Sequence, residues 1–130
     1  MNFSPLRVDE PGMTQPISRP QHGIADYGFV PVAALAPTLF GFKDEPKAAS
    51  LSRGMAATAL LTSLATRAEW GAVKKLPYRG HLALDVVSGV AAIAAPWVLG
   101  FANNRRARNA FLGFGAFALA VTALSRPEEM

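Results

Sequence analysis

The segment HLALDVVSGVAAIAAPWVLGF, residues 81–101, decides the fold because it has the length and composition of a membrane-crossing helix. It contains no charged residue between Val86 and Phe101. A helix of about 20 residues is about 30 Å long, which matches the hydrocarbon core of a bilayer. Three further apolar stretches of similar length cover residues 22–42, 48–66 and 107–125.

The apolar stretches lack the pattern of a soluble bundle. A soluble four-helix bundle carries a polar stripe along each helix. The runs VAAIAA (90–95) and FGAFALAV (114–121) have no such stripe. The chain has no cysteine, which excludes a disulfide framework and thiolate metal sites. The sequence therefore predicts an all-α membrane protein with four transmembrane helices.

The chain repeats itself at an offset of 59 residues without a gap, so that His22 and Asp26 recur as His81 and Asp85. Several less common residue types share this register, which chance rarely produces. An even number of crossings in each copy gives both copies the same orientation, so we predict two helical hairpins related as a parallel repeat. The other matching pairs are Pro37/Pro96, Gly41/Gly100, Phe42/Phe101, Gly54/Gly113, Leu60/Leu119, Arg67/Arg126 and Glu69/Glu128.

The repeat divides the chain into four parts. We predict a polar, proline-rich arm over 1–21, a first two-helix repeat over 22–69, a connecting loop over 70–80 and a second two-helix repeat over 81–128. The prolines of the arm disfavour helix. A loosely ordered tail is the favoured interpretation of the arm, and an arm that lies along a membrane surface or a partner is the alternative.

The repeated pattern resembles a known family. His-x-x-x-Asp, an apolar run, Pro-Trp-x-x-Gly-Phe and a second apolar span are similar to the SPW-repeat family of small bacterial integral membrane proteins. The resemblance covers about residues 22–128 and is strongest over 81–101. Ala95 stands where the family's name has serine, and the first copy reads Ala36-Pro37-Thr38. The resemblance implies a multi-pass protein of the bacterial cytoplasmic (inner) membrane and carries no activity.

Repeated prolines and glycines predict where the first helix of each hairpin ends. Pro37 and Pro96 remove a backbone N–H and are expected to kink the helix. The carbonyl group that each proline frees must then find a partner in a neighbouring helix or in water. Gly41 and Gly100 follow at the position of the left-handed residue that closes a helix.

Small residues predict how the helices associate. Without a hydrophobic driving force in lipid, helices pack through close contact at glycine and alanine. Gly54 and Gly113 occupy equivalent positions in the two copies, and we predict that helices cross there. The alanine- and glycine-rich surface also favours packing against other membrane subunits or in a homo-oligomer.

Polar residues at the ends of the spans form the candidate site, and all lie on one side of the membrane. A histidine and an aspartate four residues apart share one face of a helix. The favoured interpretation is a belt of ion pairs in which Asp26 and Asp85 lie near helix N-termini and pair with Arg67 and Arg126. In the alternative, two imidazoles and two carboxylates converge on a metal or, through the histidines, a haem. The residues are His22, Asp26, Arg67, Glu69, His81, Asp85, Arg126 and Glu128.

Motifs of several function classes are absent from the sequence. It has no Walker-type loop, no Gly-x-Ser-x-Gly elbow and no His-Glu-x-x-His motif. The net charge of +4 is dispersed, so nucleic acid is not an expected partner. We expect a non-catalytic structural or accessory protein without a cofactor, in contact with the lipid bilayer and with other membrane subunits or further copies of itself. The alternative is a haem- or metal-binding redox subunit; a small transporter ranks third.

Overall fold

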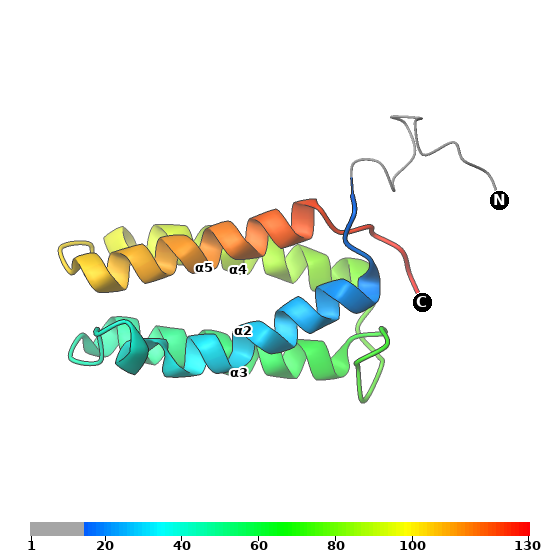
Figure 1. Cartoon of the computed structure of the whole chain (residues 1–130), viewed down its shortest axis with the longest axis horizontal. Coiled ribbons are helices and arrows are strands. Elements are labelled where there is room, and N and C mark those ends of the chain that lie inside the picture. Colours follow the sequence, from blue (N-terminus) through cyan, green and yellow to red (C-terminus); the bar gives the residue numbers. More distant parts are fainter. Residues whose placement is uncertain (1–14) are drawn as a thin grey trace.

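The described part of the chain is helical. A computed structural model describes residues 15–130, so residues 1–14 of the proline-rich arm, and the two interpretations of them, lie outside the described residues. The sequence prediction of four helices is confirmed within 15–130. The helices are α2 (Arg19–Leu39), α3 (Pro46–Ala65), α4 (Tyr78–Val98) and α5 (Arg105–Ala123) (Figure 1).

The first helix of each hairpin begins earlier than the sequence predicted. Helix α2 begins at Arg19, inside the segment assigned to the arm, because Ser18 forms a capping box with Gln21. Pro20 is compatible with this start because the first turn of a helix needs no backbone N–H from it.

Helix α4 begins at Tyr78, inside the predicted connecting loop, and the C-terminal tail caps it. Its N-cap residue, Pro77, makes no side-chain capping bond. Instead the Glu129 carboxylate accepts hydrogen bonds from the backbone N–H groups of Tyr78, at 3.0 Å, and Arg79, at 2.9 Å. These N–H groups, that of Arg79 first, lower the pKa of the Glu129 carboxyl group below its ordinary value. The chain terminus is thereby joined to the start of the second repeat.

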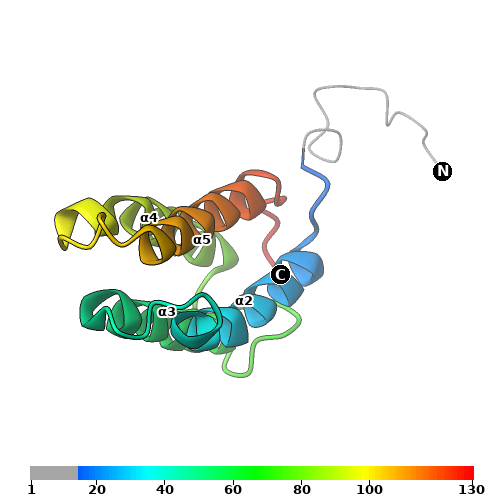
Figure 2. The ribbon, with the colours of Figure 1, turned by 60° about the vertical axis from the view of Figure 1, so that its left-hand side comes forward.

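The two hairpins have the same orientation, as the sequence predicts. Figures 1 and 2 show α2 with α3 and α4 with α5 as two layers, with the starts of α2 and α4 and the ends of α3 and α5 at one end of the molecule. The two helices of each hairpin pack extensively, whereas the hairpins meet more sparsely through α2 with α5 and α3 with α4. Ile17 forms a bridge with Ser125, and Leu76 forms one with Thr66. Because these bridges are related by the repeat offset, the fold has pseudo-twofold symmetry.

Pro37 lies inside α2, and its freed carbonyl group has a partner on α3. Proline cannot donate to the carbonyl group four residues back, which here belongs to Ala33. The Ser52 hydroxyl donates to that carbonyl oxygen at 2.6 Å in a buried position. The prediction that a neighbouring helix satisfies the kink is therefore confirmed in the first repeat. The equivalent of Ser52 in the second repeat is Phe111, which has no hydroxyl.

The predicted glycine helix ends are confirmed. Gly41 has a φ of 75° and Gly100 a φ of 82°, both in the left-handed region that favours glycine. The N–H of Phe42 donates to the Pro37 carbonyl at 2.9 Å, and Phe101 makes the same bond to Pro96 at 2.8 Å. These are the bonds of a Schellman motif, and both phenylalanine side chains are buried.

Replacing Ser52 with alanine is expected to lower the free energy of unfolding by about 1–3 kcal/mol, because it leaves the buried Ala33 carbonyl without a donor. In a Pro37→Ala background residue 37 regains a backbone N–H for that carbonyl, so Ser52→Ala should cost less there. A double-mutant cycle measured by unfolding in detergent checks this coupling. Equal costs in both backgrounds would contradict the assignment.

The predicted helix crossing at Gly54 and Gly113 is wrong within the chain. A Cβ atom added at either position would meet nothing within 4 Å. The close approach joins α4 to α5, where a Cβ on Gly115 would lie 2.6 Å from the Gly89 carbonyl oxygen. The core nevertheless contains many small side chains. The largest buried cluster consists of alanines and phenylalanines: Ala33, Ala36, Phe42, Ala48, Ala56, Ala92, Ala95, Phe101, Ala107, Phe111 and Phe114.

Among the described residues, α4 alone is clearly long and apolar enough to cross a membrane. It is the segment from which the sequence prediction started. By length and composition, the helices of residues 15–130 therefore include one membrane span, α4.

Candidate functional site

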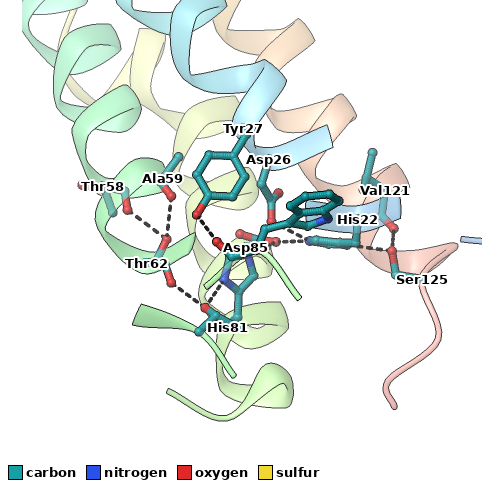
Figure 3. A network of polar contacts seen from close by, with 12 residues as sticks. His22, Asp26, Tyr27, Thr58, Ala59, Thr62, His81, Asp85, Val121 and Ser125 are labelled. Atoms are coloured by element: carbon teal, nitrogen blue, oxygen red, sulfur yellow. Dashed lines mark hydrogen bonds and ion pairs between the residues drawn. The ribbon is translucent and has the colours of Figure 1, made fainter. Parts of the chain in front are cut away.

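The two His/Asp pairs converge near the starts of α2 and α4, and Figure 3 shows the four side chains close together. His22 and Asp26 come from α2, and His81 and Asp85 come from α4. One ligand atom from each of the four residues lies within 4.8 Å of the other three. The sequence placed each pair on a helix face, and the docking of the hairpins brings the pairs together.

The shortest contacts in the cluster run between the repeats. The Nε2 atom of His22 lies 2.8 Å from Oδ2 of Asp85, and that of His81 lies 2.7 Å from Oδ2 of Asp26. Within each helix the corresponding histidine–aspartate distance is 3.2 Å. The four side chains thus form a ring in which imidazoles and carboxylates alternate.

The cluster is largely removed from solvent. The histidine side chains are 1% and 3% exposed, and those of Asp26 and Asp85 are 15% and 22% exposed. His22 and His81 lie in the first turn of their helices, whereas Asp26 and Asp85 lie one turn further along, beyond the turn in which the helix dipole favours carboxylates most. Tyr78 covers the imidazoles: its ring lies edge-on to His22 at 5.7 Å and nearly parallel to His81 at 6.5 Å.

Two hydroxyl groups hold the outer nitrogen atoms of the imidazoles. Ser125 Oγ lies 2.7 Å from Nδ1 of His22, and Thr66 Oγ1 lies 2.8 Å from Nδ1 of His81. Each hydroxyl donates its own hydrogen to a backbone carbonyl four residues earlier, in Val121 and Thr62. The hydroxyl oxygens must therefore accept from the imidazoles, which places a hydrogen on Nδ1 of both histidines. Both Nε2 atoms face the carboxylates.

Sequence reasoning missed Thr66 and Ser125. They are separated by the same 59 residues as the histidines, so the repeat register contained the signal. The match was hidden because threonine and serine are different residue types. Their shared feature is a hydroxyl group at the C-terminal end of the second helix of each hairpin, α3 and α5.

The predicted pairing of Arg67 and Arg126 with the central aspartates is wrong, because the imidazoles occupy the carboxylates. Arg67 donates to the carbonyl oxygen of Met130 at 3.3 Å. Arg126 donates to the carbonyl oxygen of Gln15 at 3.0 Å and lies 3.9 Å from the Glu128 carboxylate. Both arginines contact backbone carbonyl groups outside the helices and are not part of the cluster.

Glu69 and Glu128 also lie outside the cluster, and both contact Arg19. The Arg19 guanidinium donates to both carboxylate oxygens of Glu69, at 2.9 and 2.7 Å. This bond lowers the pKa of Glu69 below its ordinary value. Arg19 also donates to the backbone carbonyl of Glu128 at 2.8 Å. Of the eight predicted site residues, four converge and four form a peripheral set of terminal contacts.

The geometry does not fit a haem held by the two histidines. The imidazole centroids are 5.5 Å apart at an interplanar angle of 82°, and the two carboxylates contact both Nε2 atoms. The adjoining cavity has a volume of about 10 Å³, which is about the room that one water molecule needs. A macrocycle has no place between these residues, whereas a single ion is small enough.

A single family model covers both the four helices and the His/Asp cluster. The family model described as the SPW repeat domain matches residues 21–125. The chain belongs to the SPW repeat family. The resemblance predicted from the sequence is confirmed, and the matched region contains both His/Asp pairs together with Thr66 and Ser125. No curated protein and no solved structure matches the chain.

The triplet that names the SPW repeat lies at the opposite end of α4 from the cluster. Pro96 is buried and its carbonyl group accepts the bond that ends the helix, while Trp97 is 58% exposed. In this SPW repeat protein, Pro96 and Trp97 therefore belong to the C-terminal end of α4. The polar chemistry is concentrated at the start of each repeat.

Proposed function

We propose that this SPW repeat protein is a non-catalytic integral protein of the bacterial cytoplasmic membrane. In this proposal its four helices cross the bilayer as two parallel hairpins, and it acts as an accessory subunit that packs against a helix of another membrane protein. Family membership and the apolar helix α4 support a membrane location. Large apolar side chains exposed on all four helices also support it; they include Leu35, Leu61, Val87 and Phe117.

Two apolar grooves between the hairpins carry the packing proposal. One has a volume of about 800 Å³ and includes Phe29, Val32 and Gly113 in its lining. The other has a volume of about 410 Å³ and includes Gly54 and Ala91. Gly54 and Gly113 are repeat mates, as are Val32 and Ala91, so the grooves are related by the pseudo-twofold symmetry.

The two glycines make each groove suitable for a helix. A Cβ added at Gly54 or Gly113 would meet nothing within 4 Å, so the backbone is open to a partner at both positions. Helices in membranes approach one another closely at such small residues. In this proposal Gly54 and Gly113, which the sequence predicted as helix-packing positions, contact a helix of another membrane protein.

Groove-filling variants test the proposal. Protein purified in mild detergent from its native membrane is expected to retain one membrane partner in stoichiometric amount, identified by mass spectrometry. Gly54→Leu and Gly113→Leu should lose this partner because leucine fills the groove. Ala57→Leu and Ala116→Leu, which are exposed repeat mates on the same helices outside the grooves, should retain it.

Other outcomes would overturn parts of the proposal. Recovery of the wild-type protein in the soluble fraction would exclude the membrane location. A homo-oligomer that the groove variants dissociate would replace the external subunit with a second copy of the chain. Partner binding that is equal in all four variants would remove the grooves from the interface.

A further inference from the structure

We propose that His22, Asp26, His81 and Asp85 bind one divalent transition-metal ion between the two repeats. The ion would join the start of α2 to the start of α4. This proposal does not depend on the packing role. The cluster and the grooves share only Asp26 and Asp85, which also line the smaller groove. It is tested on the purified chain alone.

The donor set and its spacing suit such an ion. Two imidazole nitrogens and two carboxylate oxygens are ligands that Zn²⁺ and its neighbours accept. With metal–ligand bonds of about 2.0–2.2 Å, tetrahedral ligands lie about 3.3–3.6 Å apart. The histidine–aspartate separations of 2.7–3.2 Å in the cluster are shorter by several tenths of an ångström. Small side-chain rotations accommodate this difference.

The inner nitrogen of His81 points to a missing partner. This atom is buried and has no hydrogen-bond partner among residues 15–130, although two carboxylate oxygens lie 2.7 and 3.2 Å away. Its geometry with these oxygens is outside that of a hydrogen bond. The matching atom of His22 does lie in hydrogen-bond geometry with the Asp85 carboxylate. In the metal-free protein, protons on the imidazoles compensate the carboxylates, and a divalent cation held between the four side chains would displace the Nε2 protons and take over that role.

The cluster also has the charge and the outer contacts of a metal site. With neutral imidazoles the two carboxylates contribute a charge of −2, which one divalent ion neutralises. Thr66 and Ser125 accept hydrogen bonds from Nδ1 of His81 and His22 and so direct both Nε2 atoms inward. Histidine ligands of metals characteristically donate their other N–H in this way, which fixes the tautomer and the ring orientation.

The first experiment measures metal binding to the wild-type protein. The protein is purified in detergent with a histidine-free affinity tag, treated with chelator and titrated with Zn²⁺ by calorimetry. One Zn²⁺ per chain is expected, and Zn²⁺ should raise the unfolding temperature by mass action. Co²⁺ should give the visible absorption of a tetrahedral nitrogen–oxygen site. Because the chain has only two histidines, nitrogen ligation reports on His22 and His81.

Matched variants locate the ion. His81→Ala is expected to abolish saturable binding. Thr66→Val keeps all four ligands and should weaken Zn²⁺ binding about 10–100-fold through loss of the outer hydrogen bond. Thr62→Val is the control: it removes a hydroxyl one turn away on α3, keeps the carbonyl that Thr66 contacts, and introduces the residue that the second repeat carries at Val121. Its affinity should match that of the wild type.

Three results would overturn the proposal. The first is the absence of saturable Zn²⁺, Co²⁺ and Mn²⁺ binding by the folded wild-type protein, which would leave a ring of ion pairs. The second is wild-type affinity in a folded His81→Ala variant, which would place the ion elsewhere. The third is an equal loss of affinity in Thr66→Val and Thr62→Val. It would mean that Thr66→Val weakens binding by disturbing the end of α3 and not by removing the hydrogen bond to His81.

Discussion

Replacing Asp85 with asparagine is expected to lower the free energy of unfolding of the metal-free protein by about 3–5 kcal/mol. The Asp85 carboxylate lies 2.8 Å from Nε2 of His22 and 3.2 Å from Nε2 of His81, and both imidazoles are almost fully buried. Removing one partner of a buried charge cluster leaves the others without compensation. Unfolding in mild detergent with chelator present, followed by circular dichroism, measures the change.

The same experiment contains its controls. Asp26→Asn should have an equal effect, because Asp26 faces the same two imidazoles through the pseudo-twofold symmetry. Asp44→Asn, at an exposed carboxylate between α2 and α3, should change the free energy of unfolding by no more than about 0.5 kcal/mol. If Asp85→Asn proved as mild as Asp44→Asn, the cluster would not hold the two repeats together.

Gly115→Ala is expected to destabilise the fold by about 1–3 kcal/mol, because it forces α5 away from α4. The added Cβ would lie 2.6 Å from the Gly89 carbonyl oxygen and would also collide with the Ile93 side chain. The isoleucine can rotate, but the backbone carbonyl moves only if the helices separate. Thermal unfolding in detergent measures the loss.

Gly113→Ala, two residues earlier on the same helix, is the matched comparison. Its Cβ would meet nothing within 4 Å, and alanine is favoured over glycine in helices by up to about 1 kcal/mol. The two substitutions should therefore change stability in opposite directions. A Gly115→Ala variant as stable as Gly113→Ala would contradict the close contact between α4 and α5.

The positions of individual helices could be predicted from local sequence. Apolar stretches about 20 residues long predicted the helices. Pro37 and Gly41 predicted the end of α2, because proline narrows and glycine widens the range of backbone dihedral angles wherever they occur. The starts of the helices were less predictable. Ser18 caps α2 through its own neighbours, but the start of α4 is capped by Glu129, about 50 residues away in the chain.

The sequence by itself determined the four helices, the repeat and the two His/Asp pairs, since spacings of four residues along a helix and 59 residues along the chain are one-dimensional properties. Only the tertiary structure decided that the pairs meet. Their convergence depends on how one hairpin docks against the other, and neither hairpin encodes that distance. The same holds for Gly115, which differs from Gly113 only in the side of α5 that faces Gly89. The tertiary structure also decided the partners of Arg67 and Arg126. Docking of the hairpins places the imidazoles against the aspartates, so the arginines bind other groups.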